Sequence, residues 1–387
     1  MTQSKQLEKQ KIRLFAWALI FCNALFCFCD SPTMGIRFYL PIFLPALGIG
    51  IISFFKNNIK LGIEHLTCGI LFLIVILHLG NSLDNFGEKN TSLFSTNILI
   101  FFFFVFSAFR YNLKEVKYII NSLVIAGTGF SILLFLFSFH LGLGHYTIKQ
   151  FNGYYQYIDP NYLSSFMIIP CIILMKRAIF TNRNFLNTLL FLINILAVLL
   201  TGSRAAMLSV MLALIILLIV NKNKKTFFIL FIMAIFIGFG VFLFLDTNVI
   251  ERLFINSYVD GSNHLRFIFW ISHIAFVIKT SPIIGLGLSY NQYSWDLYHT
   301  SHSTFISLFA SFGLVGVIFI FILFLRIFKN LFSKDSILFL ALFVAFIFVN
   351  QMIPAQISYS FWGILLIFII IVHFKQDYPE ISLWKEL

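Results

Sequence analysis

Long apolar runs, each close to the length of a membrane-spanning helix, follow one another along most of this chain. A hydrocarbon core about 30 Å thick takes roughly 20 apolar residues as a helix, and on that scale the chain contains about twelve spans. The runs are continuous rather than alternating, which favours helices over barrel strands. The expected spans lie near residues 14–30, 36–55, 61–80, 93–109, 118–140, 161–180, 185–200, 203–220, 226–245, 303–325, 336–352 and 357–374. The pattern predicts an all-α polytopic membrane protein, with residues 1–387 forming a single transmembrane domain.

The basic residues between the spans assign the two faces of the membrane. With the N-terminus in the cytoplasm, twenty of the 27 Lys and Arg residues fall in cytoplasmic segments, as the positive-inside rule requires. The other face holds Arg37, Lys89, Lys149, Arg204, Arg252, Arg266 and Lys279. Both termini are therefore expected in the cytoplasm. A cation at the outer edge, where such residues are scarce, usually has an anionic partner, which singles out Arg204 and Arg266.

Composition excludes the soluble classes and several kinds of site. The chain is 60% hydrophobic and 11% charged, whereas the surface of a soluble domain needs far more charge. The net charge of +12 comes without the interleaved aromatic residues and glycines of a nucleic-acid module, so no nucleic-acid partner is expected. The five cysteines lie in or beside apolar runs and lack zinc-like spacing to histidine. We expect no disulfide, metal or other cofactor. The first run lacks a small-residue cleavage site, which predicts a retained helix rather than a signal peptide.

One outer loop, residues 246–302, is much longer than the others, and long structured loops tend to be functional. Its segment 265–279 is apolar except for a few residues, among which Arg266 and His273 share one helical face with Trp270. The segment is too short and interrupted to span, so we expect an amphipathic helix lying at the membrane surface. The sequence SPIIGLGLSY that follows predicts a turn, because it contains Pro and paired Gly.

The segment LTGSRAAML, residues 200–208, joins two apolar runs and places Arg204 at the start of the second. Ser203 or Thr201 is expected to cap that helix, whose free N–H groups and positive dipole end would point outward. A cation is disfavoured there unless an anion joins it, so backbone amides and guanidinium could together bind a phosphate. The alternative is that Arg204 extends to lipid headgroups.

Two further segments carry candidate chemistry. His302 stands at the outer start of the tenth span, with His299 one turn before it, and histidine can accept a proton near neutral pH. The alternative is local hydrogen bonding at the interface. Asp159 and Asn161 stand at the outer start of the sixth span and could line the same cavity, although Asp-Pro is also an ordinary helix start. The outer acidic residues form no tight pair that would hold a divalent metal on phosphates.

Four motifs in this order resemble the O-antigen ligase and polymerase superfamily. They are TGSRAA, then R-x-x-x-W formed by Arg266 and Trp270, then SPIIGLG, and then His302 followed at the family's spacing by Gly313 in FGLVG. DPNYLSSF is also similar to the N-P-N-[YF] segment of many members. The resemblance covers roughly residues 155–320. Ser303 stands where the family commonly has Asn after the histidine. This difference affects which hydrogen bonds can form around His302.

The resemblance implies a metal-independent, inverting glycosyltransferase with a GT-C-like helical architecture. Its donor would be a glycan on undecaprenyl diphosphate at the periplasmic face of the bacterial inner membrane. Arg204 and Arg266 would bind the diphosphate and His302 would act on the acceptor hydroxyl. The expected substrate-binding residues beside the two arginines are Ser203, Trp270, His299, Asp159 and Asn161.

The alternatives within and beyond this family differ in acceptor and in activity. A polymerase would use a lipid-linked repeat unit as acceptor and could work with a chain-length regulator; a ligase would use lipid A–core. The compact loop and IDPNYLSSF favour the polymerase. A transporter of lipid-linked sugars would also bind diphosphate through its arginines. Such a transporter should have charged residues within its spans, or two halves related as an internal repeat. Apart from Glu64, His65, His78 and His140 near span ends, the expected spans are bare of charge, and no inverted repeat is evident.

Overall fold

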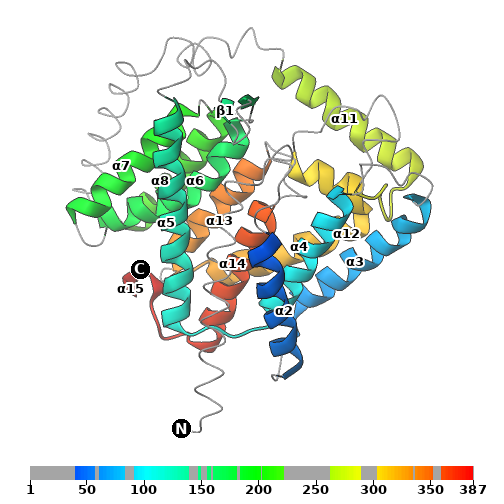
Figure 1. The fold of residues 1–387 in the computed structure, drawn as a ribbon, viewed down its shortest axis with the longest axis horizontal. Helices are drawn as coiled ribbons and strands as arrows, with labels where there is room; N and C mark the ends of the chain where they lie inside the picture. Colours follow the sequence, from blue (N-terminus) through cyan, green and yellow to red (C-terminus); the bar gives the residue numbers. More distant parts are fainter. Residues whose placement is uncertain are drawn as a thin grey trace.

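The computed structural model describes residues 40–56, 61–82, 91–138, 147–149, 155–157, 160–180, 184–201, 203–221, 262–288, 303–333, 336–351 and 359–386. These residues are helical almost throughout (Figure 1). The helices are α2 (Leu40–Lys56), α3 (Ile63–Ser82), α4 (Thr91–Ser107), α5 (Leu113–Ser138), α6 (Pro160–Met175), α7 (Phe185–Leu200), α8 (Arg204–Asn221), α11 (Ser262–Thr280), α12 (Thr304–Leu331), α13 (Ile337–Asn350), α14 (Tyr359–Asp377) and α15 (Leu383–Glu386). The helical character predicted from hydropathy is confirmed. The spans expected near 14–30 and 226–245 lie outside the described residues.

Two short strands are the departure from helix within the described part of the chain. Strand β1 (Thr147–Lys149) pairs with β2 (Tyr155–Tyr157) in antiparallel register, with Ile148 opposite Gln156. Both strands lie between the expected spans 118–140 and 161–180. The described residues agree with the expected all-α class, and hydropathy gave no sign of this short pair of strands, because it carries no information about pairing between neighbouring segments.

One helix of the described residues, α12, is by its own length and composition able to cross a bilayer. Shorter apolar segments are Ile63–His78, Ile98–Ser107, Phe185–Leu200, Ala205–Ile219 and Ile337–Asn350. The number of about twelve spans therefore stays a prediction.

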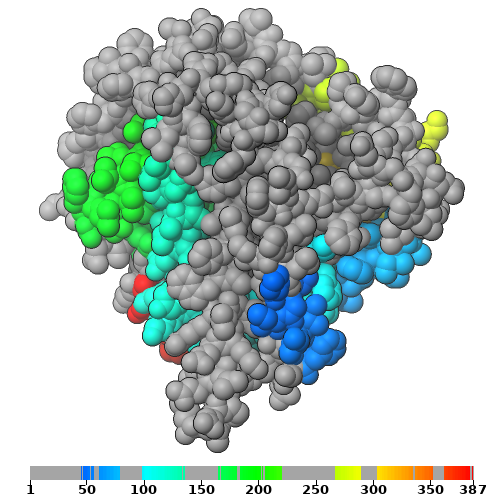
Figure 2. All heavy atoms as spheres, viewed as in Figure 1, coloured from blue at the N-terminus to red at the C-terminus, as the bar shows by residue number. Residues whose placement is uncertain are grey.

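Large apolar side chains stand on the outside of several helices, as lipid-facing surfaces require. Examples are Phe55 on α2, Leu73 on α3, Phe185 on α7 and Ile219 on α8, all more than half exposed. Figure 2 shows α7 and α8 in green at one edge of the visible face, with α2 and α3 in blue at another. So many exposed large apolar side chains are unusual on a soluble monomer and fit a surface that a membrane covers.

Helix α14 is the centre of the bundle. Every residue from Phe361 to Phe374 is buried, and the helix packs against α4, α5, α12 and α13. A helix that is apolar on all sides is stable only when neighbours surround it on all sides. These four helices lie next to α14 in the bundle (Figure 1).

A buried ionic cluster joins three helices at the end that the charge pattern assigns to the cytoplasm. Glu64 of α3 is fully buried and forms an ion pair with Arg326 of α12. The Nε2 atom of His373, on α14, lies 2.9 Å from Glu64 Oε1. Nearby, Arg110 Nε lies 3.7 Å from Asp377 Oδ2. A buried carboxylate needs such partners, because an unpaired charge in an apolar interior is costly.

Helix α12 is interrupted at Gly313, whose backbone has φ 64° and ψ −165°. In an unbroken helix the N–H groups of Leu314 and Val315 would bond to the C=O groups of Ala310 and Ser311. The interruption separates these donors and acceptors. Buried main-chain groups left without partners would be expensive, so something else must pair them.

The turn formed by residues 281–288 pairs all four groups, an arrangement we term the interlock. Its bonds run from Leu314 N–H to Pro282 C=O (2.9 Å), from Val315 N–H to Ile283 C=O (3.1 Å), from Leu286 N–H to Ala310 C=O (2.8 Å) and from Gly287 N–H to Ser311 C=O (3.0 Å). The turn thus takes the place of one missing helical turn of α12. The predicted turn at SPIIGLG is confirmed, and its partner is the FGLVG segment.

Glycine is required where the two segments of the interlock cross. Gly285 has φ 74°, and a Cβ atom there would lie 2.5 Å from the main-chain N of Gly313. A Cβ atom on Gly313 would in turn meet the main chain of Gly285 and Ile283 at less than 3 Å. These neighbours are backbone atoms of paired segments, so they cannot move aside without breaking the interlock.

We predict that Gly313→Ala destabilises the protein by at least about 2 kcal/mol, because it combines a left-handed backbone with main-chain overlap. The measurement is the thermal unfolding midpoint of purified protein in detergent. Gly69→Ala is the matched control: an added Cβ at this helical position in α3 meets nothing within 4 Å. The control should unfold at or slightly above the original midpoint. Equal midpoints for the two variants would contradict the interlock.

Candidate active site

The start of α8 is organised by the two hydroxyl groups that precede it. Thr201 Oγ1 donates to Val198 C=O (2.6 Å) and accepts from Ser203 N–H (3.2 Å). Ser203 Oγ accepts from Ala206 N–H (3.2 Å), which makes Ser203 the N-cap of α8. The predicted cap is therefore confirmed, and both hydroxyl-bearing residues are buried.

Arg204 is the first residue of α8, as the sequence predicted. The first turn of a helix presents N–H groups and the positive end of the helix dipole, which together favour an anion. The Arg204 side chain lies outside the described atoms. Its backbone position is confirmed, and its role in binding phosphate stays a prediction.

Helix α11 turns the face that carries Arg266, Trp270 and His273 toward the protein and a face of large apolar residues outward. Arg266 and Trp270 are half-buried and His273 is fully buried. The outward residues are Phe267, Ile268, Ile271 and Ile278, all between 42% and 58% exposed. This is the reverse of a helix on a soluble protein, and it fits a helix whose outer face lies against lipid. The predicted amphipathic helix is present; its place at the membrane surface stays a prediction.

His273 is neutral near pH 7. Its Nδ1–H donates to Phe269 C=O (2.7 Å), which assigns the lone pair to Nε2. Burial lowers the pKa of His273 below its ordinary value, and the hydrogen bond to Phe269 opposes this shift. The imidazole therefore adds no second positive charge on the face that carries Arg266.

The C-terminal half of α11 is fixed to α12. Val277 of α11, Leu286 of the turn and Ala310 of α12 form a small buried cluster, covered by Phe276 and Phe309. The interlock follows directly along the chain. Arg266 is thus carried by a helix that two kinds of contact, apolar packing and main-chain bonds, attach to α12.

Helix α12 begins with a cap at Ser303. Ser303 Oγ accepts from Ile306 N–H (3.4 Å), and Ser303 C=O accepts from Ser307 N–H (3.0 Å). Ser and Asn are both strong N-cap residues, so Ser303 can replace the Asn of the resembled motif without loss of the helix start. His302 immediately precedes this cap in the sequence. His302 and His299 lie outside the described residues.

Helix α6 begins at Pro160, as the Asp-Pro interpretation predicts. Asp159 lies outside the described residues. Asn161 is the second residue of α6, and its side chain is not among the described atoms. The helix start alone explains why Asp-Pro occurs here, with no need for a bound ligand. The substrate-binding role of Asp159 and Asn161 therefore stays a prediction.

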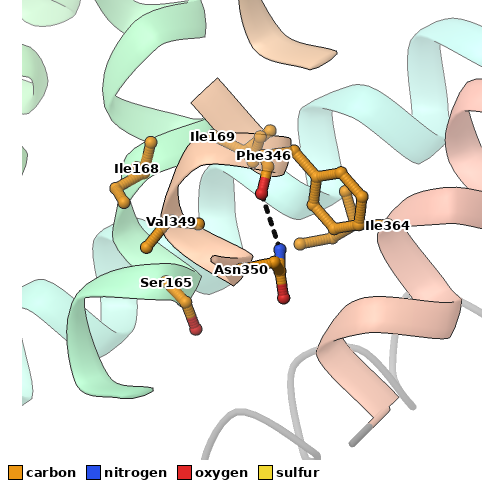
Figure 3. Close-up of a pocket in the computed structure, with 7 residues that line it drawn as sticks. All are labelled: Ser165, Ile168, Ile169, Phe346, Val349, Asn350 and Ile364. Carbon is orange, nitrogen blue, oxygen red and sulfur yellow. Dashed lines mark hydrogen bonds between the residues drawn. The ribbon is translucent and has the colours of Figure 1, made fainter. Parts of the chain in front are cut away.

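A narrow crevice lies near the first turns of α6, between α6, α13 and α14 (Figure 3). It is lined by Ser165, Ile168, Ile169, Phe346, Val349, Asn350 and Ile364. Asn350 Nδ2 donates to Phe346 C=O (2.7 Å), a local bond one helical turn back. Its lining is mostly apolar, with Ser165 and Asn350 as the polar members, and none of the lining side chains is ionisable.

The helices that carry the predicted site residues belong to one bundle. Helix α8 packs against α6 and α13, while α11 packs on α12, which itself contacts α13. The convergence of Arg204, Arg266 and His302 in one pocket stays a prediction, because two of these side chains lie outside the described atoms.

No group of three or more His, Cys, Asp or Glu side chains within the described ranges is arranged to hold a metal ion. The charged cluster around Glu64 was not predicted from hydropathy, and it lies at the opposite end of α3 from the interlock. The sequence feature that could have pointed to it is a carboxylate within an expected span.

Comparison with known proteins bears on the central part of the chain. Residues 189–321 match the family model described as O-antigen ligase. The matched region runs from α7 into α12 and includes Ser203, Arg204, Arg266 and His302. Among curated proteins no match to the chain was found. The match supports O-antigen ligase- or polymerase-type activity in the inner membrane, with lipid-linked glycans as substrates. The resemblance seen in the four motifs is thereby confirmed: residues 189–321 are similar to the O-antigen ligase family, which supports a relation to the O-antigen ligase and polymerase superfamily.

Proposed function

We propose that the protein is an O-antigen or surface-polysaccharide polymerase. It transfers a glycan from undecaprenyl diphosphate to the next lipid-linked repeat unit, at the periplasmic face of the inner membrane. The observation that carries this proposal is the orientation of α11. An arginine faces the protein on a helix whose outer face is apolar, within the region that matches the family.

The proposed role of the arginines follows from the chemistry of the donor. A polyprenyl diphosphate is an activated leaving group, so the enzyme must stabilise the negative charge that grows on it as the glycosidic bond breaks. The guanidinium groups of Arg204 and Arg266 each offer a fork of donors to phosphate oxygens. The Ser203-capped start of α8, whose first residue is Arg204, would add main-chain N–H groups to this site.

His302 is proposed as the group that takes the proton from the acceptor. The acceptor hydroxyl attacks the anomeric carbon from the side opposite the diphosphate, which leaves with the bonding electron pair, so the configuration inverts. His302 accepts the hydroxyl proton as the new bond forms. The hydrogen-bonded start of α12 at Ser303 supports this assignment, because it gives the residue before it a fixed anchor.

The remaining assignments extend the same proposal. Trp270 and His299 would contact the donor from the loop 246–302, and Asp159 and Asn161 would contact sugars from the start of α6. The architecture would be GT-C-like, with both termini cytoplasmic and the loop periplasmic. A chain-length regulator is a possible protein partner of a polymerase.

A ligase is the second candidate, because the matching family model is described as O-antigen ligase. A ligase would make the same diphosphate contacts and transfer the glycan to lipid A–core. The compact loop and the IDPNYLSSF segment support the polymerase.

Replacement of Arg204, Arg266 or His302 by Ala is expected to reduce glycan extension at least about a hundredfold, because charge stabilisation or proton transfer is lost. Lys at either arginine position should restore little, since the planar fork is absent. Extension is measured from the lipopolysaccharide ladder, with membrane protein quantified in parallel. Lys279→Ala, at an exposed position in the last turn of α11, is the control and should remain active. Full activity of Arg204→Ala together with Arg266→Ala would refute the diphosphate contacts.

Transfer is expected to continue in EDTA, because guanidinium groups rather than a divalent ion bind the diphosphate in this proposal. The measurement is extension of lipid-linked repeat units in membranes with and without chelator. A loss in EDTA that added Mg²⁺ restores would refute the metal-independent mechanism.

A strain that lacks the gene should separate the polymerase from the ligase. We expect core carrying a single repeat unit on a lipopolysaccharide gel, because ligation continues while extension stops. Bare core with polymer accumulating on the carrier lipid would show the ligase instead.

A further inference from the structure

His78, from a helix outside the region that matches the family, contacts the interlock directly. It is buried near the C-terminal end of α3. Its Nε2 atom lies 3.0 Å from Gly285 C=O, in the middle of the turn. The ring also lies against Gly287, where a Cβ atom would come within 3.1 Å of three His78 atoms. The close approach of ring and turn therefore depends on glycine at that position.

The two ring nitrogens of His78 contact different carbonyl groups. Nδ1 lies 2.7 Å from Ile74 C=O, four residues back in the same helix. Nε2 reaches Gly285, which is 207 residues away in sequence. A neutral imidazole carries one N–H and can donate to one carbonyl at a time. In the tautomer that carries its proton on Nε2, the ring donates to Gly285 C=O and joins α3 to the interlock, whereas the contact of Nδ1 with Ile74 is local to α3.

The interlock leads to both proposed catalytic segments. On one side of the turn lies α11, which carries Arg266; on the other side of the break lies the first part of α12, which begins after His302. A shift of the turn would move α11 relative to α12, because Leu286 is packed between Val277 and Ala310. Misplacement of a binding group by about 1 Å can cost a hundredfold in rate.

We propose that His78 is a positioning residue for glycosyl transfer. Its hydrogen bond to Gly285 holds the turn, and the turn holds α11 and α12 in the relative placement that brings Arg266 to the diphosphate beside His302. The inference rests on the function proposed above. It assigns a role in the reaction to α3, which lies outside the matched residues.

Two amide substitutions separate the two carbonyl contacts of His78. In His78→Gln the side-chain amide can reach the place of Nε2 and donate to Gly285 C=O. In His78→Asn the amide reaches only the place of Nδ1 and donates to Ile74 C=O. Thr67→Val is the control, because it removes another buried side-chain bond of α3, from Thr67 Oγ1 to Ile63 C=O (2.8 Å), without touching the turn.

The experiment measures kcat and KM of the purified full chain in lipid nanodiscs with a lipid-linked repeat unit. Amide hydrogen exchange of peptides covering 281–288 and 310–316 is measured on the same preparations. We expect His78→Asn to lower kcat about tenfold, because the turn loses its contact with α3 and Arg266 is placed less precisely, with KM changed less than about twofold. Exchange of the two peptides should become faster. His78→Gln and Thr67→Val should keep kcat and exchange close to the original.

Each contrary outcome is decisive. Equal kcat for His78→Asn and His78→Gln overturns the proposal, and so does faster exchange without a fall in kcat. The lost activity could instead be accounted for by a smaller amount of folded protein or a lower thermal unfolding midpoint. That result would show a structural role for His78 and would also overturn the proposal. Failure of the proposed function is distinguishable, because Arg266→Ala would then be active while the exchange effect of His78→Asn would persist.

Discussion

The exchange of main-chain hydrogen bonds between the turn 281–288 and the break in α12 is the constraint on which the central part of this structure depends. A helix interrupted inside an apolar bundle leaves donors and acceptors with no water to satisfy them, at a cost of several kcal/mol for each group. The turn meets that demand with four bonds between 2.8 and 3.1 Å. Two glycines with positive φ, Gly285 and Gly313, let the backbones approach closely enough to form them.

The same arrangement explains how two distant motifs come to act as one unit. SPIIGLG supplies the turn and FGLVG supplies the break, and neither segment would be stable without the other. Helix α11 enters this unit and α12 leaves it, so the placement of Arg266 is tied to the helix that follows His302. A cap at Ser203 and a cap at Ser303 fix the two helix starts beside the proposed catalytic residues.

Helices outside the matched region support that unit. Helix α3 holds α12 near both ends: Glu64 pairs with Arg326 at one end, while His78 contacts the interlock at the other. Helix α14 fills the centre and adds His373 to the Glu64 cluster. The buried ion pair couples helices in a way that apolar packing alone does not, because removal of either charge leaves the other uncompensated.

The sequence by itself determined the features that depend on a few neighbouring residues. Continuous apolar runs predicted the helices, hydroxyl residues predicted the cap at Ser203, Pro160 predicted a helix start, and paired glycines predicted the turn. These follow from helical periodicity and from bonds within about four residues, so they can be recognised locally. Only the tertiary structure decided that the turn enters α12, that Glu64 meets Arg326, that His78 reaches Gly285, and that α11 faces inward with its arginine. These contacts join segments far apart in the chain, and hydropathy contains no information about which buried surfaces meet.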